Sequence, residues 1–310
     1  IDHFTYVFCG DGCLMEGITH EACSLAGTLE LGKLIAVYDD NEISIDGDVS
    51  GWFTEDIPKR FESYGWHVIS NVDGHDSSMI NKAFEQAKKN QKQPTIICCK
   101  TKIGKGSPNK AGTASAHGSA LGEEEVALSR KELNWEHPAF VIPDEIYLGW
   151  DAKDIGNSRE EEWQKLFQNY EIKYPDLAGV LKRSLSNELP DDFTNQINEF
   201  IDNLQGSQND IASRKSSEVV LNFLGPLLPE LIGGSADLSG SNNTRWAGTK
   251  AINESVTHGN YIYYGVREFA MTAIVNGLVL HGGVRPYAGT FLTFLDYARN
   301  AVRLAALMEI

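Results

Sequence analysis

The stretch FTYVFCGDGCLMEGITHEACSLAGTLELGKLIAVYDDN, residues 4–41, contains two apolar runs separated by a segment with helical spacing. The first run, 4–9, predicts a strand, and the second, 34–38, predicts another. Between them, apolar side chains recur at helical intervals over 14–31, and Gly32 is a natural helix stop. Strand, helix and strand in this order are typical of a parallel sheet, so the stretch predicts an α/β fold.

The same alternation continues along the chain and begins again in its last third. Segments 55–64 and 78–90 predict helices, and runs 66–69 and 95–99 predict strands. A second pattern of this kind begins near residue 216. Its expected elements are helices at 216–224, 266–281 and 292–308 and strands at 231–234 and 261–264.

A long loop and a polar helical segment separate the two patterns. Residues 101–122 are rich in Gly, Ser, Lys and Ala and are too long for a simple connection, which predicts a functional loop. The following residues are polar and helical, with prolines at positions 143, 175 and 190. We therefore expect a first domain at 1–150, a helical linker at 151–213 and a second domain at 214–310.

Neither end of the sequence has the features of a natural domain end. Ile1 precedes a strand almost directly, and the apolar helical run from Leu304 to Ile310 has no cap. Strands of parallel sheets are buried and need neighbours. We therefore expect a piece of a longer chain in which both domains are incomplete; the alternative is a complete chain with docked termini.

Composition narrows the classes of function. The 310 residues include 27 basic and 43 acidic side chains, and the net charge of −16 is unfavourable for a nucleic-acid or membrane-surface binder. No apolar run approaches the roughly 20 residues of a membrane span. The five cysteines form no CxxC pair, which predicts buried reduced thiols in a cytoplasmic protein, with Cys98 and Cys99 on opposite faces of one strand.

Polar residues end the first two expected strands. Gly10, Asp11 and Gly12 follow one strand, and Asn41 follows the next. The carboxyl ends of parallel strands are where ligands bind, and glycines let a ligand approach the backbone closely. The Asp11 carboxylate, the Asn41 side-chain oxygen and the Ile43 carbonyl could provide three of the oxygens that Mg²⁺ requires beside a diphosphate. The plainer alternative is a strand-end turn with a helix-capping aspartate.

Longer strings around these residues resemble the transketolase family of thiamine-diphosphate enzymes. The likeness covers nearly the whole chain and implies two domains of the thiamine-diphosphate-binding type, each with a parallel sheet flanked by helices. The end of a diphosphate-binding domain would precede the beginning of a pyrimidine-binding domain. The strings are GDGCLMEGITHEACSLAGTLELGKLIAVYDDNEISIDG at 10–47, KGSPNKAGTASAHGSALG at 105–122, GGSADLSGSN at 233–242 and GNYIYYGVREFAMTAIVNGLVLHGG at 259–283.

The resemblance implies a thiamine-diphosphate site with Mg²⁺, for which Ca²⁺ could substitute. Asp11, Asn41 and the carbonyl of Ile43 match the metal ligands of the family. His117 matches a histidine that faces the thiazolium and the substrate, and Glu268 matches the carboxylate that bonds the aminopyrimidine ring. The further cofactor-binding residues that it implies are Gly10, Gly12, Asp237 and an aromatic wall of Phe291, Phe294 and Tyr297.

Substrate and partner are also implied by the resemblance. Arg214 and Ser241 match contacts to the sugar phosphate, and Glu16 and Glu21 match acidic residues at the interface of a homodimer, near Glu268. The implied reaction is the reversible transfer of a two-carbon ketol group. The donor would be a ketose phosphate such as xylulose 5-phosphate, and the acceptor an aldose phosphate such as ribose 5-phosphate or erythrose 4-phosphate, as in the pentose phosphate pathway.

Two titratable residues fit proton transfer by their own chemistry. Glu268 precedes an apolar helical run, and a carboxyl group held in a dry place keeps its proton more readily. His117 lies in a Gly- and Ser-rich loop and could move protons near neutral pH. The plainer alternatives are a helix-start acid, a surface histidine and, for the aromatic residues, one face of a helix packed in the core.

Other readings stay open from the sequence. GDGCLMEG and DDNEISIDG argue against a deoxyxylulose-phosphate synthase. An enzyme similar to dihydroxyacetone synthase would differ mainly in substrate. A catalytically silent fragment or an interaction subunit is the alternative of another class.

Overall fold

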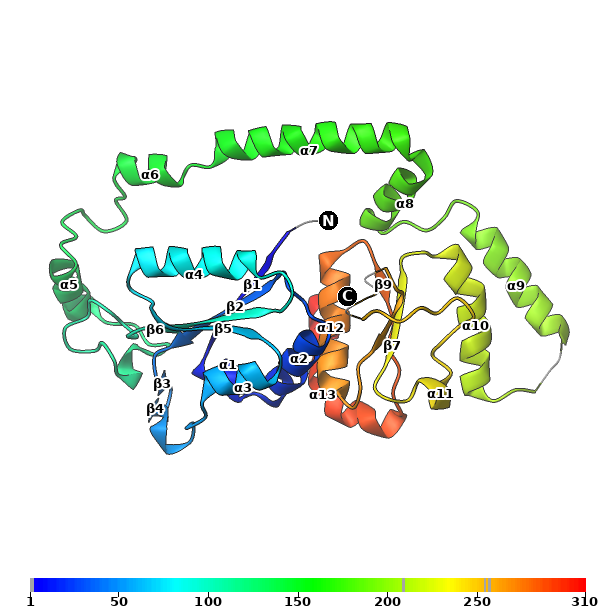
Figure 1. Cartoon of the computed structure of the whole chain (residues 1–310), viewed down its shortest axis with the longest axis horizontal. Helices are drawn as coiled ribbons and strands as arrows, with labels where there is room; N and C mark the ends of the chain where they lie inside the picture. Colours follow the sequence, from blue (N-terminus) through cyan, green and yellow to red (C-terminus); the bar gives the residue numbers. More distant parts are fainter. Residues whose placement is uncertain (1–2, 208–209, 254, 256–257) are drawn as a thin grey trace. The chain divides into compact units, whose positions relative to one another are not determined.

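The computed structural model describes residues 3–207, 210–253, 255 and 258–310. The chain divides into two units between Trp150 and Asp151, and each unit has its own parallel sheet (Figure 1). The predicted α/β class with helix-flanked parallel sheets is therefore confirmed. Residues 208 and 209 of the expected linker lie outside the described residues.

Four parallel strands form the sheet of the first unit, in the order β1-β2-β6-β5. Each expected strand is present, and in register Gly10 lies opposite Asp39 where β1 and β2 end. The buried strands are rich in Ile, Val and Cys, as expected for a sheet covered on both faces. Their bounds are β1 Thr5–Gly10, β2 Leu34–Asp40, β5 His67–Asp73 and β6 Thr95–Lys100.

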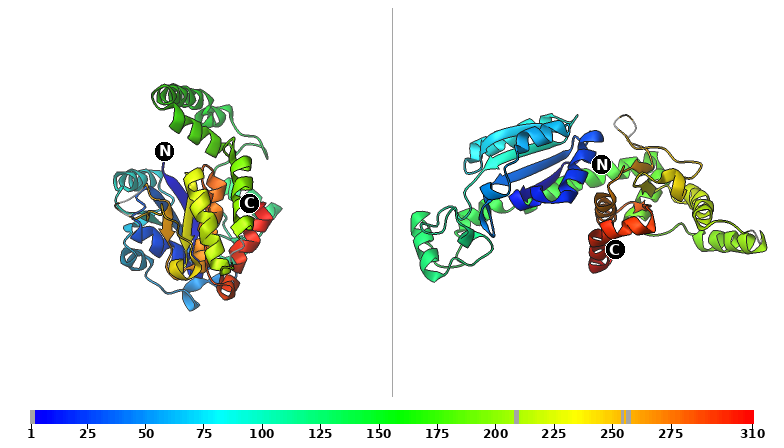
Figure 2. Two further views of the ribbon diagram at one scale, coloured as in Figure 1. Left: turned by 90° about the vertical axis from the view of Figure 1, so that its right-hand side faces the viewer. Right: turned by 90° about the horizontal axis from the view of Figure 1, so that it is seen from below.

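Helices cover both faces of this sheet (Figures 1 and 2). On one face, Leu14, Ala26 and Phe61 pack with alternate side chains of β2 and β6. On the other face, Ala83 and Ala87 pack against the remaining side chains of the same strands. The helices are α1 Asp11–Met15, α2 Gly17–Thr28 and α3 Ile57–Ser63 on the first face and α4 Ser77–Lys89 on the second.

The cysteines follow the prediction in part, since Cys98 and Cys99 are buried whereas Cys9 and Cys23 are only half-buried and Cys13 is exposed. Cys98 and Cys99 are buried in the two different cores, so they do point to opposite faces of β6. All five cysteines are free, and burial raises the pKa of Cys9 to about 12. Cys13, however, is exposed, because it lies on the outer side of the short helix α1. The expectation of buried thiols is wrong for this residue.

The expected helix at 14–31 is two helices. Helix α1 begins at Asp11, and the backbone turns extended at Glu16 (φ −63°, ψ 134°) before α2 begins at Gly17. The Thr19 hydroxyl donates to the carbonyl of Cys13, and the Thr19 N–H donates to the carbonyl of Glu16, so both sides of the break are hydrogen-bonded. Apolar spacing alone does not detect such a break because the periodicity resumes beyond it.

Strand β1 lies at the edge of the sheet. Its pairing with β2 leaves its other edge without a neighbouring strand in the described part of the chain. Tyr6, Val7 and Phe8 are exposed, and Phe8 is 73% exposed. An apolar strand with one unpaired edge is unusual for a parallel sheet, whose strands are normally covered.

The rest of the first unit consists of short elements and the loop at 101–122. The 3₁₀ turn η2, Ala114–Ala116, directly precedes His117. A two-residue hairpin, β3 Ile43–Ser44 with β4 Gly47–Asp48, follows the end of β2. The other elements are the 3₁₀ turn η1 Val49–Gly51 and the helices α5 Glu123–Glu132 and α6 Asp144–Trp150.

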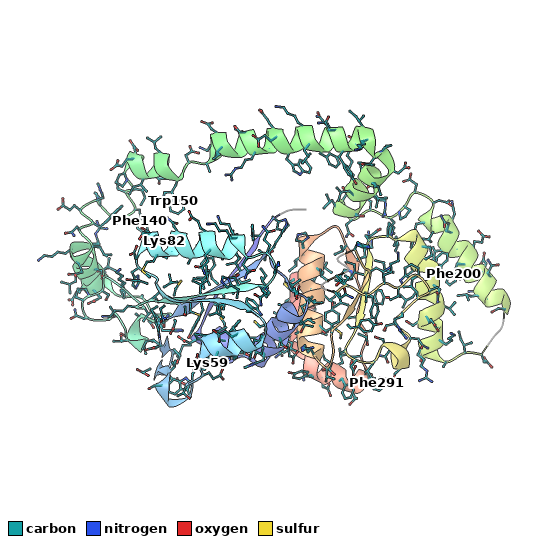
Figure 3. All side chains as sticks on the ribbon, viewed as in Figure 1. Lys59, Lys82, Phe140, Trp150, Phe200 and Phe291 are labelled. Atoms are coloured by element: carbon teal, nitrogen blue, oxygen red, sulfur yellow. The ribbon has the colours of Figure 1, made fainter. Side chains whose placement is uncertain are left out.

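Polar helices open the second unit. Helix α9 contacts α10 through stacking of Phe200 on Phe223, whose ring centroids are 4.1 Å apart; Phe200 is labelled in Figure 3. Both helices have apolar residues along one face, as the sequence pattern indicates. The helices are α7 Lys153–Lys173, α8 Pro175–Leu185, α9 Phe193–Ser207 and α10 Ser213–Leu227.

A three-stranded parallel sheet, in the order β8-β7-β9, forms the centre of the second unit. The two-residue strand β9 was not expected from the sequence because it is too short to show a period. None of the helices in the described part of the chain combines the length and hydropathy of a transmembrane segment. The elements are β7 Leu231–Ser235, α11 Ser239–Asn242, β8 Tyr261–Tyr263, α12 Glu268–His281, β9 Arg285–Pro286, the 3₁₀ turn η3 Leu292–Phe294 and α13 Leu295–Met308.

A buried ion-pair cluster connects α8 to this sheet. Both oxygens of Glu230 accept from Arg183, at 2.8 and 2.9 Å, and Arg285 Nε lies 3.5 Å from Glu230 Oε1. Burial opposes ionisation of Glu230, but the hydrogen bonds and charge of Arg183, with the charge of Arg285, outweigh it and lower the pKa of Glu230. The ion pairs therefore hold α8 against the three-stranded sheet of its own unit.

Candidate functional site

A cavity of about 650 Å³ lies where β1 and β2 end. A cavity of this size is within the range of cofactor sites. It gathers residues that are far apart in the sequence, since the loop at 101–122 reaches the same place as the two strand ends. Its lining includes Gly10, Asp11, Gly12, Asn41, Ile43 and His117, all of which were singled out from the sequence.

Asp11 is the carboxylate at the centre of this arrangement. It is 4% exposed and begins α1. One carboxylate oxygen accepts from the hydroxyl of the buried Tyr38, and the other accepts from the N–H of Glu42 at 3.1 Å. Burial raises the pKa of Asp11, and the hydrogen bond from Tyr38 opposes that rise. The carboxylate is therefore held in one orientation, with lone pairs left on both oxygens.

Asn41 and Ile43 are fixed by the turn that leaves β2. The side-chain oxygen of Asn41 accepts from the N–H of Ile43 at 3.0 Å, and its amide donates to Asp39 at 3.2 Å. Pairing of Ile43 with Asp48 in the β3–β4 hairpin holds the next residues. Residues of this turn and Asp11 thus line one cavity.

The charges of the cavity decide what it can bind. Asp11, Asp39 and Asp46 line it, and no Lys or Arg is among its lining residues. A diphosphate would therefore be repelled unless a cation bound with it. In the described part of the chain, no three His, Cys, Asp or Glu side chains are placed to hold a metal by themselves. One carboxylate with amide and carbonyl oxygens, completed by phosphate oxygens and water, fits Mg²⁺ or Ca²⁺.

His117 is the titratable residue that the loop brings to this cavity. It follows η2, and its N–H donates to the carbonyl of Ala114 at 2.9 Å. Its ring atom Nδ1 is buried and has no hydrogen-bond partner among the described residues. A buried polar atom without a partner costs free energy unless a ligand or water satisfies it. The ring nitrogen thus lacks a partner that the described residues could supply.

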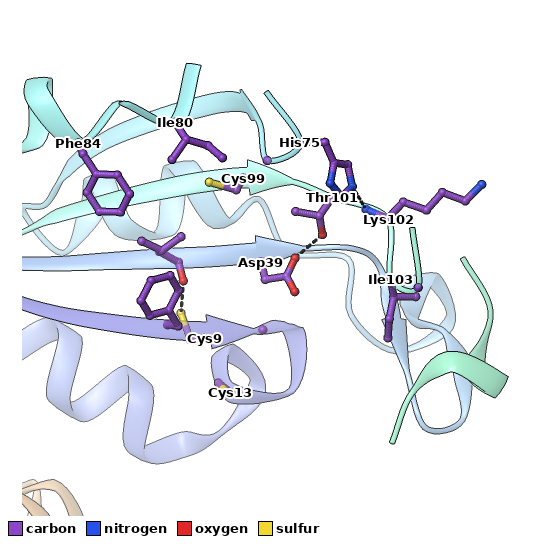
Figure 4. A pocket seen from close by; sticks show the side chains of 15 residues that line it. Cys9, Cys13, Asp39, His75, Ile80, Phe84, Cys99, Thr101, Lys102 and Ile103 are labelled. Carbon is purple, nitrogen blue, oxygen red and sulfur yellow. Dashed lines mark hydrogen bonds between the residues drawn. The ribbon is translucent and has the colours of Figure 1, made fainter. Parts of the chain in front are cut away.

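A neighbouring cavity of about 660 Å³ shares Gly10, Cys13, Asp39 and Ile103 with the first (Figure 4). Here the start of the 101–122 loop is tied to the sheet edge. The hydroxyl of Thr101 donates to Asp39, and the N–H of Lys102 donates to Nε2 of His75 at 2.9 Å. These bonds fix where the loop departs from β6.

In the second unit, Glu268 is the first residue of α12. Glu268 is only 6% exposed, and the helix residues Ala270 and Met271 close to it in the sequence are also buried. The expectation that this carboxyl group lies in a dry place agrees with that burial. The burial of Glu268 therefore keeps its carboxyl group largely away from water.

The three predicted wall residues do not form one face of a regular helix. Phe291 precedes η3, Phe294 ends η3, and Tyr297 lies in α13. The rings of Phe291 and Phe294 stack with centroids 5.9 Å apart, whereas Tyr297 packs on Phe269 at 6.3 Å. The spacing predicts that the three residues share one helical face, and this prediction is wrong because the chain forms the 3₁₀ turn η3 here. With 42, 42 and 53% exposure, the rings are not core residues either.

The remaining predicted residues of the second unit are exposed. Arg214 lies in the first turn of α10, Ser241 lies in α11, and Asp237 has a left-handed backbone conformation (φ 59°) just before α11. A cavity of about 480 Å³ around Arg245 and Trp246 contains none of these three residues, nor Glu268. Their roles stay predictions.

The expected interface acids differ in exposure. Glu16 is exposed at the break between α1 and α2, and Glu21 is half-buried on α2. The break places Glu16 outside both helices, directly after the short helix that carries Asp11. Whether these acids meet a partner subunit stays a prediction.

Three residues near the site were missed from the sequence. The sequence pattern predicts Tyr38 only as a strand residue, although its hydroxyl is the donor to Asp11. Glu42 contributes a backbone N–H, which no sequence pattern reveals. Glu125 is a buried carboxylate that accepts from the 101–122 loop. A signal existed only for Tyr38, since a buried tyrosine normally requires a partner for its hydroxyl.

Two family models match the chain. Residues 1–190 match the model described as "Transketolase, thiamine diphosphate binding domain", and residues 209–310 match the model described as "Transketolase, pyrimidine binding domain". Together they include all the predicted site residues. The order of the two domains is the one that the sequence motifs imply.

Curated relatives agree with the family models. The chain is 59% identical over 310 residues to transketolase 2 of Vibrio parahaemolyticus, of which it covers 47%. It is 57% identical over 309 residues to transketolase 1 of Escherichia coli, of which it covers 46%. The chain therefore spans about half the length of the curated relatives that it matches.

Solved structures show the same similarity. A transketolase from Pichia stipitis in complex with sedoheptulose 7-phosphate matches with a TM-score of 0.92 and 41% identity, covering 99% of this chain and 46% of that one. The transketolase from Campylobacter jejuni matches with a TM-score of 0.86 and 37% identity, covering 100% and 46%. With both family models and relatives at this identity in agreement, the chain belongs to the transketolase family.

Proposed function

We propose that this chain is part of a thiamine-diphosphate-dependent transketolase, which transfers a two-carbon ketol group between sugar phosphates in the cytoplasm, as a step of the pentose phosphate pathway. The observation that carries the proposal is the single cavity that brings Asp11, Asn41, Ile43 and His117 together. Sugar phosphates are the ligands named for complexes of similar structures. No observation favours the dihydroxyacetone synthase-like alternative or a silent subunit.

The proposed cofactor site rests on the donor set of the first unit. Asp11, the side-chain oxygen of Asn41 and the carbonyl of Ile43 would hold Mg²⁺, or Ca²⁺ in its place, while Gly10 and Gly12 leave room for the diphosphate. Bound thiamine diphosphate supplies the electron sink for breaking and forming the carbon–carbon bond. The protein supplies orientation and proton transfer.

Residues of both units have proposed roles around the cofactor. Buried Glu268 would hold a proton against a nitrogen of the aminopyrimidine ring. His117, with its unpartnered Nδ1, would accept or return a proton of a substrate hydroxyl. The aromatic residues would exclude water from the ring, and Asp237 would lie beside the cofactor. Arg214 and Ser241 would hold the substrate phosphate.

We further propose a homodimer in which each site combines the first unit of one protomer with the second unit of its partner. The exposure of Phe291, Phe294 and Tyr297 supports this, because such rings are normally covered in a working site. Glu16 would then face Glu268 of the partner subunit, and one proton shared between two carboxyl groups would favour the contact.

Calorimetry with thiamine diphosphate and Mg²⁺ tests the cofactor site in the complete protein that carries this chain. Asp11→Ala removes the only charged oxygen of the proposed donor set, so metal-dependent cofactor binding should fall below detection while the fold is retained. Glu85→Ala, an exposed acid on α4 that does not line this cavity, is the control. Undiminished affinity in Asp11→Ala would contradict the site.

Mixing two inactive variants tests the shared site. Asp11→Ala and Glu268→Gln proteins are unfolded together and reassembled, and ketol transfer is measured. If each site uses two subunits, heterodimers contain one intact site, and random assembly restores about a quarter of the wild-type activity. If each site is built within one chain, the mixture stays inactive and the dimer proposal is wrong.

A further inference from the structure

One buried carboxylate fastens the loop that carries His117 to helix α5. Glu125 is 7% exposed. One of its oxygens accepts from the hydroxyl of Ser107 and from the N–H of Asn109 at 2.8 Å. The other accepts from the side-chain amide of Asn109 at 2.9 Å. Three neutral donors of one loop segment therefore converge on one anion.

The fastened segment is connected to His117 by short contacts within the loop. The N–H of Ser107 donates to the carbonyl of Gly104 at 2.9 Å, and the N–H of Gly112 donates to the carbonyl of Ile103 at 2.8 Å. A side chain at Gly104, which has φ 64°, would lie 2.9 Å from Cβ of Ala116, the neighbour of His117. A shift of Ser107 would thus be passed to Gly104 and on to the turn before His117.

The charge of Glu125 makes this attachment strong. Hydrogen bonds from Ser107 and Asn109 lower its pKa to about 2, so the group stays ionised throughout the physiological range. A buried carboxylate that lost these donors would be left unpaired, which costs far more than a broken surface contact. The position of Glu125 therefore determines the position of the loop segment that contains Ser107 and Asn109.

We propose that Glu125 is a positioning residue that sets where His117 stands in the candidate site. It does not line the cavity of about 650 Å³, and it does not touch Asp11 or Asn41 in any contact that the structure describes. Its effect on the site should therefore reach the loop residues of the cavity, His117 among them, and leave the metal-diphosphate side unchanged. The effect on turnover rests on the proposed function, whereas the effect on the loop does not.

The experiment exchanges the polarity of the Glu125–Asn109 pair in the complete protein. Asn109→Asp alone places two carboxylates together and should release the loop. Asn109→Asp with Glu125→Gln puts an amide opposite a carboxylate again and should restore it. Glu125→Ala removes the attachment, and Glu124→Ala, one residue earlier and exposed on the same helix, is the control.

Two readouts separate positioning from general stability. Hydrogen–deuterium exchange of the peptide 101–122 should rise in Asn109→Asp and Glu125→Ala and return in the double variant, with peptide 5–47 unchanged. In the same variants, kcat/KM for the ketose phosphate should fall by about 100-fold, the size of a misplaced catalytic group, while affinity for thiamine diphosphate stays within twofold.

Each remaining outcome counts against the proposal. A folded Glu125→Ala protein with wild-type exchange of the loop would overturn it, as would a double variant that is not restored. Equal loss of cofactor affinity would show a general structural role instead. If the unmodified protein lacks ketol transfer, the proposed function fails, and the exchange of the loop still decides whether Glu125 holds it.

Discussion

Asp11 in the first unit and Glu268 in the second are both buried carboxyl groups, but their surroundings differ. Asp11 has two donors that fix its oxygens, and it shares one cavity with the other predicted residues of its unit. Glu268 shares its unit with exposed aromatic rings and exposed polar residues, and the second unit gathers none of them into the cavity around Arg245.

The difference shows where preorganisation resides. Polar groups that must hold a divalent ion are set in advance, because reorienting them at the moment of binding would cost free energy. Apolar rings need no fixed orientation before binding, because contact with a covering surface is sufficient to order them. In the proposed site, the first unit would therefore supply an anchor that is largely preorganised, and the second unit would supply a part that still has to be covered.

Glu268→Gln should break the second half most severely. The amide keeps the size of the side chain but has no transferable proton, so exchange of the thiazolium proton with deuterated solvent should slow by about 100-fold or more. Binding of the diphosphate should stay nearly normal, because its anchor lies in the first unit. Proton NMR of the bound cofactor after a quench in acid measures the exchange.

Glu199→Gln, an exposed acid of the same unit, is the control for this change. Exchange at the wild-type rate in Glu268→Gln would remove the proposed role of Glu268. A loss of diphosphate binding would instead show that the two halves are not separable.

Arg183→Met should destabilise the second unit and leave the anchor of the first unit intact. It leaves the carboxylate of Glu230 buried with only Arg285 nearby, and breaking such a pair costs about 3 kcal/mol. Denaturant unfolding, followed by tryptophan fluorescence, measures the loss. Calorimetry should find unchanged Mg²⁺ and diphosphate binding; reduced binding would mean that the units depend on each other.

The effect of Arg183→Met on the free energy of unfolding should depend on pH in a defined direction. The pKa of Glu230 is lower in the folded protein than its ordinary value of 4.5. Its contribution is therefore fully present above about pH 4.5 and is lost as the pH falls through the folded pKa. Arg183→Met should flatten this acid limb of the stability curve, and an unchanged limb would contradict the assignment.

Tyr38→Phe should have the smallest effect, and it tests how far the anchor depends on preorganisation. Phenylalanine fits the same core but removes the donor to Asp11, so affinity for Mg²⁺ in the presence of diphosphate should fall by about 10-fold to 100-fold. Tyr147→Phe, an exposed tyrosine, is the control. Unchanged affinity would show that the N–H of Glu42 alone is sufficient to orient Asp11.

Patterns in the sequence predict the first unit well. Apolar runs and helical spacing place β1, β2, β5 and β6 within a few residues, because buried parallel strands are continuous apolar segments. Glycine and polar residues after the strands predict the cavity that gathers Asp11 and Asn41. The joining of His117 to them follows from the family resemblance, because a loop of this length has no period to predict its path.

Features set by single bonds are not predictable in this way. The break at Glu16 depends on the bonds of Thr19, and the 3₁₀ turn at Leu292–Phe294 changes the face that Tyr297 occupies. The attachment of Ser107 and Asn109 to Glu125 joins residues that are 16 to 18 positions apart. Such contacts depend on tertiary packing, which local spacing does not contain.

The edge of β1 that pairs with no strand among the described residues has a practical consequence for anyone who prepares these 310 residues by themselves. Its backbone groups can pair with a strand of another molecule, and the exposed ring of Phe8 would add apolar contact to that pairing. The net charge of −16 acts over the whole surface and is screened by salt, so it would not protect this one edge. Colloidal behaviour, shelf life and the yield of refolding would then be decided by six residues of one strand, Thr5–Gly10.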